Sequence, residues 1–331
     1  MRMGGAKGRR IDWVDALRAL AMFFVILGHH LNDVTGYFVF TSPIKIPLFF
    51  MITGCVFNYG RTRIGGFFKS LFFKLIVPWL CLTVPFVLIR AIVSGPSIIP
   101  QGLYNIVSGT EAWYMPCLAV AEIIWFFICK LGKKPLPISI AAAAVCVLGV
   151  LAGRRGILDF AMISRAMTAQ LFILMGYLFK THEERIERIG WAPLAALAAV
   201  YIGMGFVSLK VWPESCIDVH LNSYYSYPFC LAVILIGCFT VFAAAKKLCE
   251  REGVKVPRLI CFLGQTTLVY YLLNPYNGLI LTKALAMLHI ELPRALDIAA
   301  HMIFTYVACG VEAALILRFC PWVLGRKKKR E

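Results

Sequence analysis

Charged side chains are scarce in this sequence. Asp, Glu, Lys and Arg together make up 15% of its 331 residues, whereas 60% of the residues are hydrophobic. About a quarter of an average soluble domain is charged, so the composition excludes that class of protein. Apolar runs of about 20 residues, long enough to cross a bilayer as a helix, recur along the chain. The sequence therefore predicts an all-α, polytopic transmembrane helical bundle.

Paired metal-ligand and redox motifs are missing as well. The twelve cysteines include no Cys-x-x-Cys pair, and most of them stand singly inside apolar runs, as small core residues do. We therefore expect no metal site and no permanently bound cofactor. No A-x-A-like site marks the first apolar run as a cleaved signal peptide. No stretch between the runs suits a soluble domain, so residues 1–331 are expected to form a single transmembrane domain, with basic tails over the first 10–11 residues and over 326–331.

The distribution of basic residues predicts the topology. Lys and Arg gather in both tails and in the even-numbered connections between apolar runs, while the odd-numbered connections hold few. Because cytoplasmic segments carry the excess of Lys and Arg, both termini are expected in the cytoplasm, which requires an even number of spans. The same rule accounts for the formal charge of +17, so we expect no nucleic-acid partner. About ten spans are expected, near residues 12–31, 43–60, 75–94, 112–129, 136–153, 159–179, 191–209, 227–245, 259–284 and 295–318.

The first of these segments carries Asp15, Arg18, His29 and His30. Ionisable groups are costly in hydrocarbon and usually face a protein interior or a water-filled cavity. Arg18 and His29 are eleven residues apart, which on a helix returns to within about 20° of the same direction with a rise of about 16 Å. Both side chains are therefore expected on one stripe, one near the inner and one near the outer end of the helix. That is the geometry of a site that works across a membrane.

Each of these groups has a structural interpretation beside the functional one. His29 titrates near neutral pH and could take a proton from an acceptor hydroxyl, but a histidine between membrane helices can also act only as a hydrogen-bond partner. Arg18 keeps its charge and needs an anion. That anion could be Asp15, three residues earlier, or a substrate phosphate at the cytoplasmic mouth.

Further polar groups have two interpretations each. Lys69 and Lys74 follow the second span and either reflect topology alone or form a phosphate-binding rim. Glu111, just before Trp113 at the outer mouth, could orient the histidine, bind the acceptor or simply be solvated. Arg165 in the sixth span is either a cavity residue or a side chain that extends to the outer interface.

Two other patterns predict contacts between side chains or helices. Gly54 in the second span suits a close approach to a neighbouring helix. Asp297 and His301, four residues apart on the tenth span, are expected to pair with each other.

Short motifs spread along the chain form a set. Asp15-x-x-Arg18 is followed, after ten residues, by His29. The later blocks are Pro47-Leu48-Phe49-Phe50 with Thr53-Gly54, Lys69…Lys74…Pro78, Trp113-Tyr114-Met115-Pro116 and Tyr271-Leu272-Leu273-Asn274-Pro275. Together they resemble the acyltransferase-3 family of integral-membrane O-acyltransferases, and the likeness spans most of the chain. Asn274 stands where the family often has His, and an amide can hydrogen-bond but cannot act as a base.

The resemblance implies an enzyme that moves an acyl group, most often acetyl, from cytoplasmic acyl-CoA to a hydroxyl on the far side of the cell membrane. A cell-surface glycan or its lipid-linked precursor is the expected acceptor by family analogy. The expected catalytic residues are His29 as general base, Arg18 to hold the donor, and Glu111. The expected substrate-binding residues are Asp15, Lys69, Lys74, Trp113, Arg165 and Asn274. The expected partners are acyl-CoA, the acceptor and the lipid bilayer, and homo-oligomer formation stays open.

Two alternatives to the enzyme remain. In a secondary transporter, Arg18, Asp15 and His29 would form an ion or proton relay. Transporters often contain internal repeats, whereas this chain shows no convincing self-similarity between its halves, and its strongest polar signals cluster in the first four spans. An inactive relative that serves as an assembly partner is the other alternative, because of Asn274.

Overall fold

The computed structural model describes residues 12–31, 34–57, 63–132, 134–213, 217–251 and 254–326. The predicted basic tails lie outside these residues, apart from Arg326. The described chain is helical, with one isolated antiparallel bridge between Asp218 and Ser223. The elements are α1 (Asp12–His30), α2 (Thr35–Val56), α3 (Ile64–Leu71), the π-helix η1 (Phe72–Ile76), α4 (Val77–Ser94), η2 (Pro96–Ile98), α5 (Ile99–Ser108), α6 (Tyr114–Ile128), α7 (Pro135–Arg154), η3 (Phe160–Met162), α8 (Ile163–Thr168), α9 (Gln170–Thr181), α10 (Glu183–Glu187), α11 (Trp191–Val211), α12 (Tyr227–Cys249), α13 (Arg258–Met287), α14 (Arg294–Phe319) and η4 (Pro321–Leu324).

Helix occupies each of the ten segments in which the sequence predicts a span. Among the described residues, six helical stretches are long and apolar enough to cross a membrane, namely α2, Ile64–Ile92, α7, α11, α12 and α14. The bent pair formed by Phe160–Thr168 and Gln170–Thr181 makes up to seven. The all-α membrane bundle is therefore confirmed, while the count of ten spans stays a prediction.

The second helix begins earlier than predicted, at Thr35 instead of residue 43, and contains Pro43 and Pro47. A proline has no amide proton, so Pro47 leaves the carbonyl of Pro43 without its helical partner. The thiol of Cys238 on α12 donates to that carbonyl oxygen at 3.4 Å. A neighbouring helix thus supplies the missing donor, which is how membrane helices tolerate internal prolines.

The predicted span 159–179 is broken between α8 and α9, whose parts meet at 46°. Gln170 is fully buried at this break. Its side-chain amide donates to the carbonyl of Ala166 at 2.8 Å and to that of Ala121 on α6 at 3.2 Å. The side chain thereby satisfies backbone acceptors at the bend and ties it to α6.

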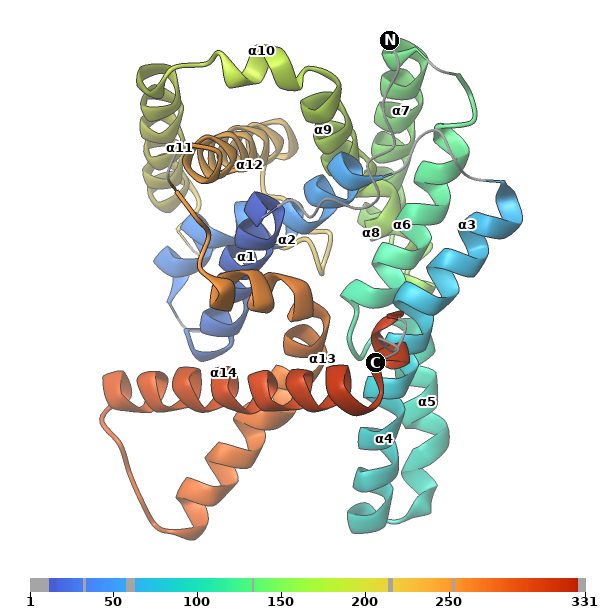
Figure 1. Cartoon of the computed structure of the whole chain (residues 1–331), viewed down its shortest axis with the longest axis vertical. Helices are drawn as coiled ribbons and strands as arrows, with labels where there is room; N and C mark the ends of the chain where they lie inside the picture. The colour runs from blue at the N-terminus through green and yellow to red at the C-terminus, as the bar shows by residue number, and fades with distance from the viewer. Residues whose placement is uncertain are drawn as a thin grey trace.

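The helices α1 and α2 lie at the centre of the bundle (Figure 1). α1 packs against α2, α12, α13 and α14, and α2 packs against α9, α11 and α12. On one side α10 joins α9 to α11 next to α12, and on the other α4 lies beside α5 and also contacts α13 (Figure 1). Helices from both halves of the chain therefore surround α1, so its polar side chains can line internal space.

The contact between α2 and α9 depends on two glycines. A Cβ added to Gly54 would overlap with the carbonyl oxygen of Ile173, and one added to Gly176 would overlap with that of Met51. Small residues let membrane helices approach until their backbones touch. The predicted close contact at Gly54 is thus confirmed, and α9 is its partner.

Replacing Gly176 by Val is expected to destabilise the fold by about 3 kcal/mol, the upper end for overpacking, because the clash is with backbone. Gly203→Val on α11 is the matched control, since a Cβ there meets no atom within 4 Å. The measurement is the midpoint temperature at which detergent-solubilised protein stops eluting as a single species after heating. Equal midpoints for the two variants would contradict the packing described here.

Candidate active site

One stripe of α1 lines two internal cavities. Arg18 and Met22 line a cavity of about 500 Å³, named the inner cavity after the predicted topology. Val25, Gly28 and His29 line an outer cavity of about 800 Å³. The side chains at 18, 22, 25 and 29 follow the spacing of one helix face. The expected geometry of Arg18 and His29 is therefore found: they share one face, and each reaches a cavity.

The inner cavity has a cationic rim. Its charged lining groups are Arg18, Lys74 and Arg326, together with one carboxylate, Glu122. Lys74 lies in the π-helix η1, a feature that is frequent at functional sites. Arg326 is held in place by donating to the backbone carbonyl of Gln265 at 3.2 Å. Three cations against one carboxylate make this cavity suited to an anionic group.

Asp15, one helical turn before Arg18 on α1, pairs with that residue. Its carboxylate is buried and lies 3.8 Å from the Arg18 guanidinium. A Cβ on Gly264 of α13 would overlap with the Asp15 carbonyl, so α1 and α13 are in backbone contact here. Asp15 lines neither cavity. It is therefore placed to hold Arg18 in position rather than to touch a substrate, whereas Arg18, whose side chain is 32% exposed, reaches the cavity.

The outer cavity brings together residues from six segments, namely α1, α2, α4, α13, residues 111–113 and residues 217–220. Its charged and aromatic lining groups are His29, Phe38, Lys45, Arg90, Glu111, Trp113, Asp218, His220, Tyr271 and Tyr276. The sequence predicts functional roles for His29, Glu111 and Trp113, whereas Lys45, Arg90 and Tyr276 are identified only by the structure. Lys45 and Arg90 are ionisable groups inside predicted spans, and that alone could have marked them as candidates.

Glu111 is the anchor of a cluster in this cavity. Its two carboxylate oxygens accept bonds of 2.8 and 2.7 Å from the Arg90 guanidinium. The Tyr276 hydroxyl also donates to it, and the Tyr276 ring stacks on Phe86 with 3.5 Å between centroids. Glu111 is thus neither a lone solvated carboxylate nor a group bonded to His29 in the described structure. The cluster joins α4, α13 and the segment before α6.

The segment that precedes α12 closes another side of the outer cavity. The ring centroids of Trp113 and His220 lie 4.8 Å apart. Arg165 donates to the backbone carbonyl of His220 at 2.9 Å and pairs with Asp159. Burial lowers the pKa of His220, and the Arg165 charge adds to this while Asp218 opposes it. Arg165 therefore holds this segment against the outer cavity without lining that cavity itself.

The two cavities meet at a shared wall made by Ile46 and Tyr271, which line both of them. The sequence predicts one site that works across the membrane, with Arg18 near its inner end and His29 near its outer end. The structure instead has two chambers, back to back, with a buried aliphatic side chain and a tyrosine between them. A group that moves from one to the other must pass these two side chains.

Two more of the predicted substrate-binding residues, Lys69 and Asn274, also line neither cavity. Lys69 is exposed on α3. Asn274 is buried on α13, and its amide donates to the carbonyls of Tyr270 at 2.8 Å and Tyr271 at 2.9 Å. Pro275 has no amide proton to complete the helical ladder at Tyr271, so the Asn274 side chain supplies a donor to that carbonyl. A structural role at this proline explains Asn274 without a substrate contact.

Asp297, His301 and Glu312 of α14 have side-chain partners in the structure. The predicted pairing of Asp297 with His301 is confirmed, with 3.2 Å between Oδ1 and Nδ1. Glu312 accepts a bond of 3.0 Å from the Asn277 amide. Neither pair lies at the cavities.

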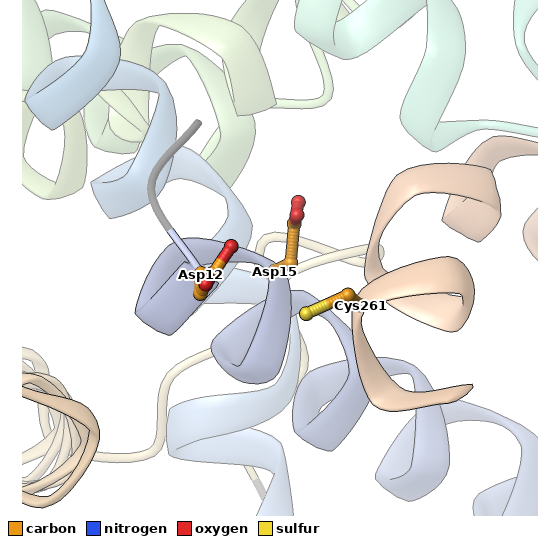
Figure 2. A group of neighbouring side chains, drawn as sticks. All are labelled: Asp12, Asp15 and Cys261. Atoms are coloured by element: carbon orange, nitrogen blue, oxygen red, sulfur yellow. The ribbon is translucent and has the colours of Figure 1, made fainter. Parts of the chain in front are cut away.

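One group of described side chains has the composition of a metal site. The ligating atoms of Asp12, Asp15 and Cys261 lie within 4.8 Å of one another. Figure 2 shows Cys261 reaching from α13 towards the first turns of α1, which carry both carboxylates. Asp15 already pairs with Arg18, and Asp12 is exposed. No further feature of the described residues points to a ligand here, and the expected absence of a metal site stays a prediction.

The fold and the cavities define a class: a helical membrane protein in which two internal chambers meet beside one polar helix. The acyltransferase-3 family, whose shared region is described as an acyltransferase domain, matches residues 11–313, nearly the whole chain. The chain belongs to this family and is a membrane acyltransferase. Neither the curated proteins nor the solved structures contain a significant match.

Proposed function

We propose that the protein is an O-acetyltransferase of the cell membrane. It takes an acetyl group from cytoplasmic acetyl-CoA and transfers it to a hydroxyl of an acceptor outside the cytoplasm. The observation that carries the proposal is the stripe of α1 on which Arg18 lines the inner cavity and His29 the outer one. This arrangement supports a reaction in which donor and acceptor enter from opposite sides.

The inner cavity suits the donor. With the predicted ten spans and cytoplasmic termini, the end of α1 that carries Arg18 and the residues after η4, which include Arg326, belong to the cytoplasmic side. Arg binds phosphate through paired N–H donors, and Lys binds it as a point charge. Arg18, Lys74 and Arg326 are the groups that would hold the phosphates of CoA, while its thioester end extends along α1 towards Tyr271.

The outer cavity suits the acceptor. His29 takes the proton of the acceptor hydroxyl as the hydroxyl oxygen attacks the thioester carbonyl carbon. The carbon–sulfur bond then breaks, and the proton passes from His29 to the departing sulfur, which leaves free CoA and an acetyl ester. Trp113 offers a flat apolar face and the Arg90–Glu111–Tyr276 cluster offers polar edges, as a sugar ring requires. The acceptor class that fits is a cell-surface glycan or its lipid-linked precursor.

A secondary transporter is the second candidate, because two chambers separated by a wall would also suit alternating access. Family membership favours the enzyme. The test uses inverted membrane vesicles and acetyl-CoA labelled separately in its acetyl and CoA parts. The enzyme releases labelled CoA outside the vesicles while labelled acetyl becomes bound to material inside them. Accumulation of both labels together, without release of free CoA, would overturn the proposal in favour of transport.

A further inference from the structure

We infer that the hydroxyl of Tyr271 is the hydrogen-bond donor that stabilises the carbonyl oxygen of the thioester while the acyl group is transferred. This inference rests on the proposed function and adds a catalytic residue to it. Its starting point is position, since Tyr271 and Ile46 line both cavities and form the wall between them. The reacting carbonyl must lie at this wall if the donor comes from one side and the acceptor from the other. Of the two side chains, only the tyrosine has a polar group.

The Tyr271 hydroxyl is held in place by the start of α6. Its oxygen accepts a bond of 3.0 Å from the backbone N–H of Tyr114, the first residue of that helix. The two tyrosine rings meet edge to face, with 5.5 Å between centroids and 69° between planes. The first amides of a helix lack intrahelical acceptors and form the positive end of its dipole. The hydroxyl oxygen is therefore fixed by a donor that does not depend on substrate.

The proton of this hydroxyl is available. A tyrosine hydroxyl has one donor proton and also accepts hydrogen bonds. Among the described residues the structure gives the Tyr271 hydroxyl one hydrogen bond, in which it accepts, and no acceptor for its own proton. A hydroxyl that already accepts a bond is polarised and becomes a better donor. The missing acceptor can be the carbonyl oxygen of a bound thioester.

The chemistry needs such a donor. When the acceptor hydroxyl attacks, the carbonyl π electrons move to the carbonyl oxygen, which carries negative charge until the carbon–sulfur bond breaks. Donors fixed in advance at that oxygen, tyrosine hydroxyls included, act where the charge develops and need no reorganisation. Tyr271 keeps its proton throughout, and His29 carries the proton that moves from acceptor to sulfur.

The rival explanation is that Tyr271 only caps α6. Tyr271→Phe separates the two roles, because it keeps the ring in the wall and removes the hydroxyl. Tyr270→Phe is the matched control, since its hydroxyl also bonds a backbone group, in this case by donating to the carbonyl of Tyr306 at 3.3 Å, but Tyr270 lines neither cavity. Release of CoA from acetyl-CoA in inverted vesicles is expected to fall about 10²-fold in kcat for Tyr271→Phe, the loss typical of one such donor. The KM for acetyl-CoA and the rate of Tyr270→Phe are expected to stay within twofold of the parent.

A spectroscopic measurement distinguishes catalysis from capping. The infrared carbonyl band of acetyl-CoA labelled with ¹³C at the carbonyl is recorded on the purified protein. Loss of the Tyr271 bond moves this band to higher wavenumber, whereas a capping role leaves it unchanged. A parental kcat or an unshifted band in Tyr271→Phe would overturn the inference. When Tyr271→Phe gives either of these results, His29→Gln in the same assay shows which proposal has failed. An inactive His29→Gln means that only the role of Tyr271 is wrong, whereas parental activity of His29→Gln means that the proposed function is wrong as well.

Discussion

Replacing His29 by Gln lowers kcat for acetyl transfer by about 10³-fold, within the range expected for loss of a general base. Glutamine fills similar space and can hydrogen-bond, but it cannot accept the acceptor's proton. The inner cavity is unchanged by this substitution, so the KM for acetyl-CoA is expected to stay near that of the parent. The measurement is the rate of CoA release in inverted vesicles at saturating acetyl-CoA, normalised to folded protein.

His30 provides the control for that prediction. Its ring lies beside that of His301, with 5.0 Å between centroids, and it lines neither cavity. His30→Gln changes the same residue type at the same end of α1, and kcat should remain within twofold of the parent. A folded, inserted His29→Gln protein with parental activity would show that the proton is taken elsewhere.

Replacing Arg18 by Gln raises the KM for acetyl-CoA by about 30-fold, which corresponds to about 2 kcal/mol, the lower end for removing one member of a charged pair. The lower end applies because the Arg18 side chain is 32% exposed and water screens its charge. Arg18→Lys keeps the charge and loses the paired donors, so its KM for acetyl-CoA should lie between those of the parent and of Arg18→Gln. Initial rates over a range of acetyl-CoA concentrations give these values.

The Arg18 variants need a control for folding and for charge. Arg18→Gln leaves the buried Asp15 without this partner, so its thermal midpoint has to be measured beside its kinetics. Arg258→Gln removes an exposed arginine at the predicted cytoplasmic end of α13 that lines neither cavity, and its KM should not change. Equal KM values for Arg18→Gln and Arg258→Gln would place the phosphates away from Arg18.

Local periodicity explains what the sequence predicts well. The positions of Arg18 and His29 follow from one helix and its 3.6-residue turn, so their common face could be predicted without knowing any neighbour. The same holds for the pair Asp297 and His301, four residues apart on α14. The close contact at Gly54 could also be expected, although the identity of its partner helix could not.

The parts that were not predicted depend on tertiary contacts. Arg90, Glu111 and Tyr276 lie far apart in the chain and meet only because α4, α13 and the segment before α6 converge on the outer cavity. Asn274 differs, because its motif predicts a substrate contact but a local feature explains the residue. Pro275 leaves the Tyr271 carbonyl without a helical donor, and the Asn274 amide supplies that donor. Short motifs therefore point to helices and segments that line the two cavities, but they do not separate residues that line a cavity from residues that support one.

The central claim is that the donor lies along α1 with its acyl end at the wall formed by Ile46 and Tyr271. Photolabelling with a butyryl-CoA analogue that carries a diazirine on its acyl chain tests this most directly, with labelled peptides identified by mass spectrometry. The predicted result is labelling of segments that line the two cavities around Tyr271, lost when excess acetyl-CoA is present. Labelling confined to lipid-facing residues of α7 or α11, or labelling that acetyl-CoA does not reduce, would contradict the account.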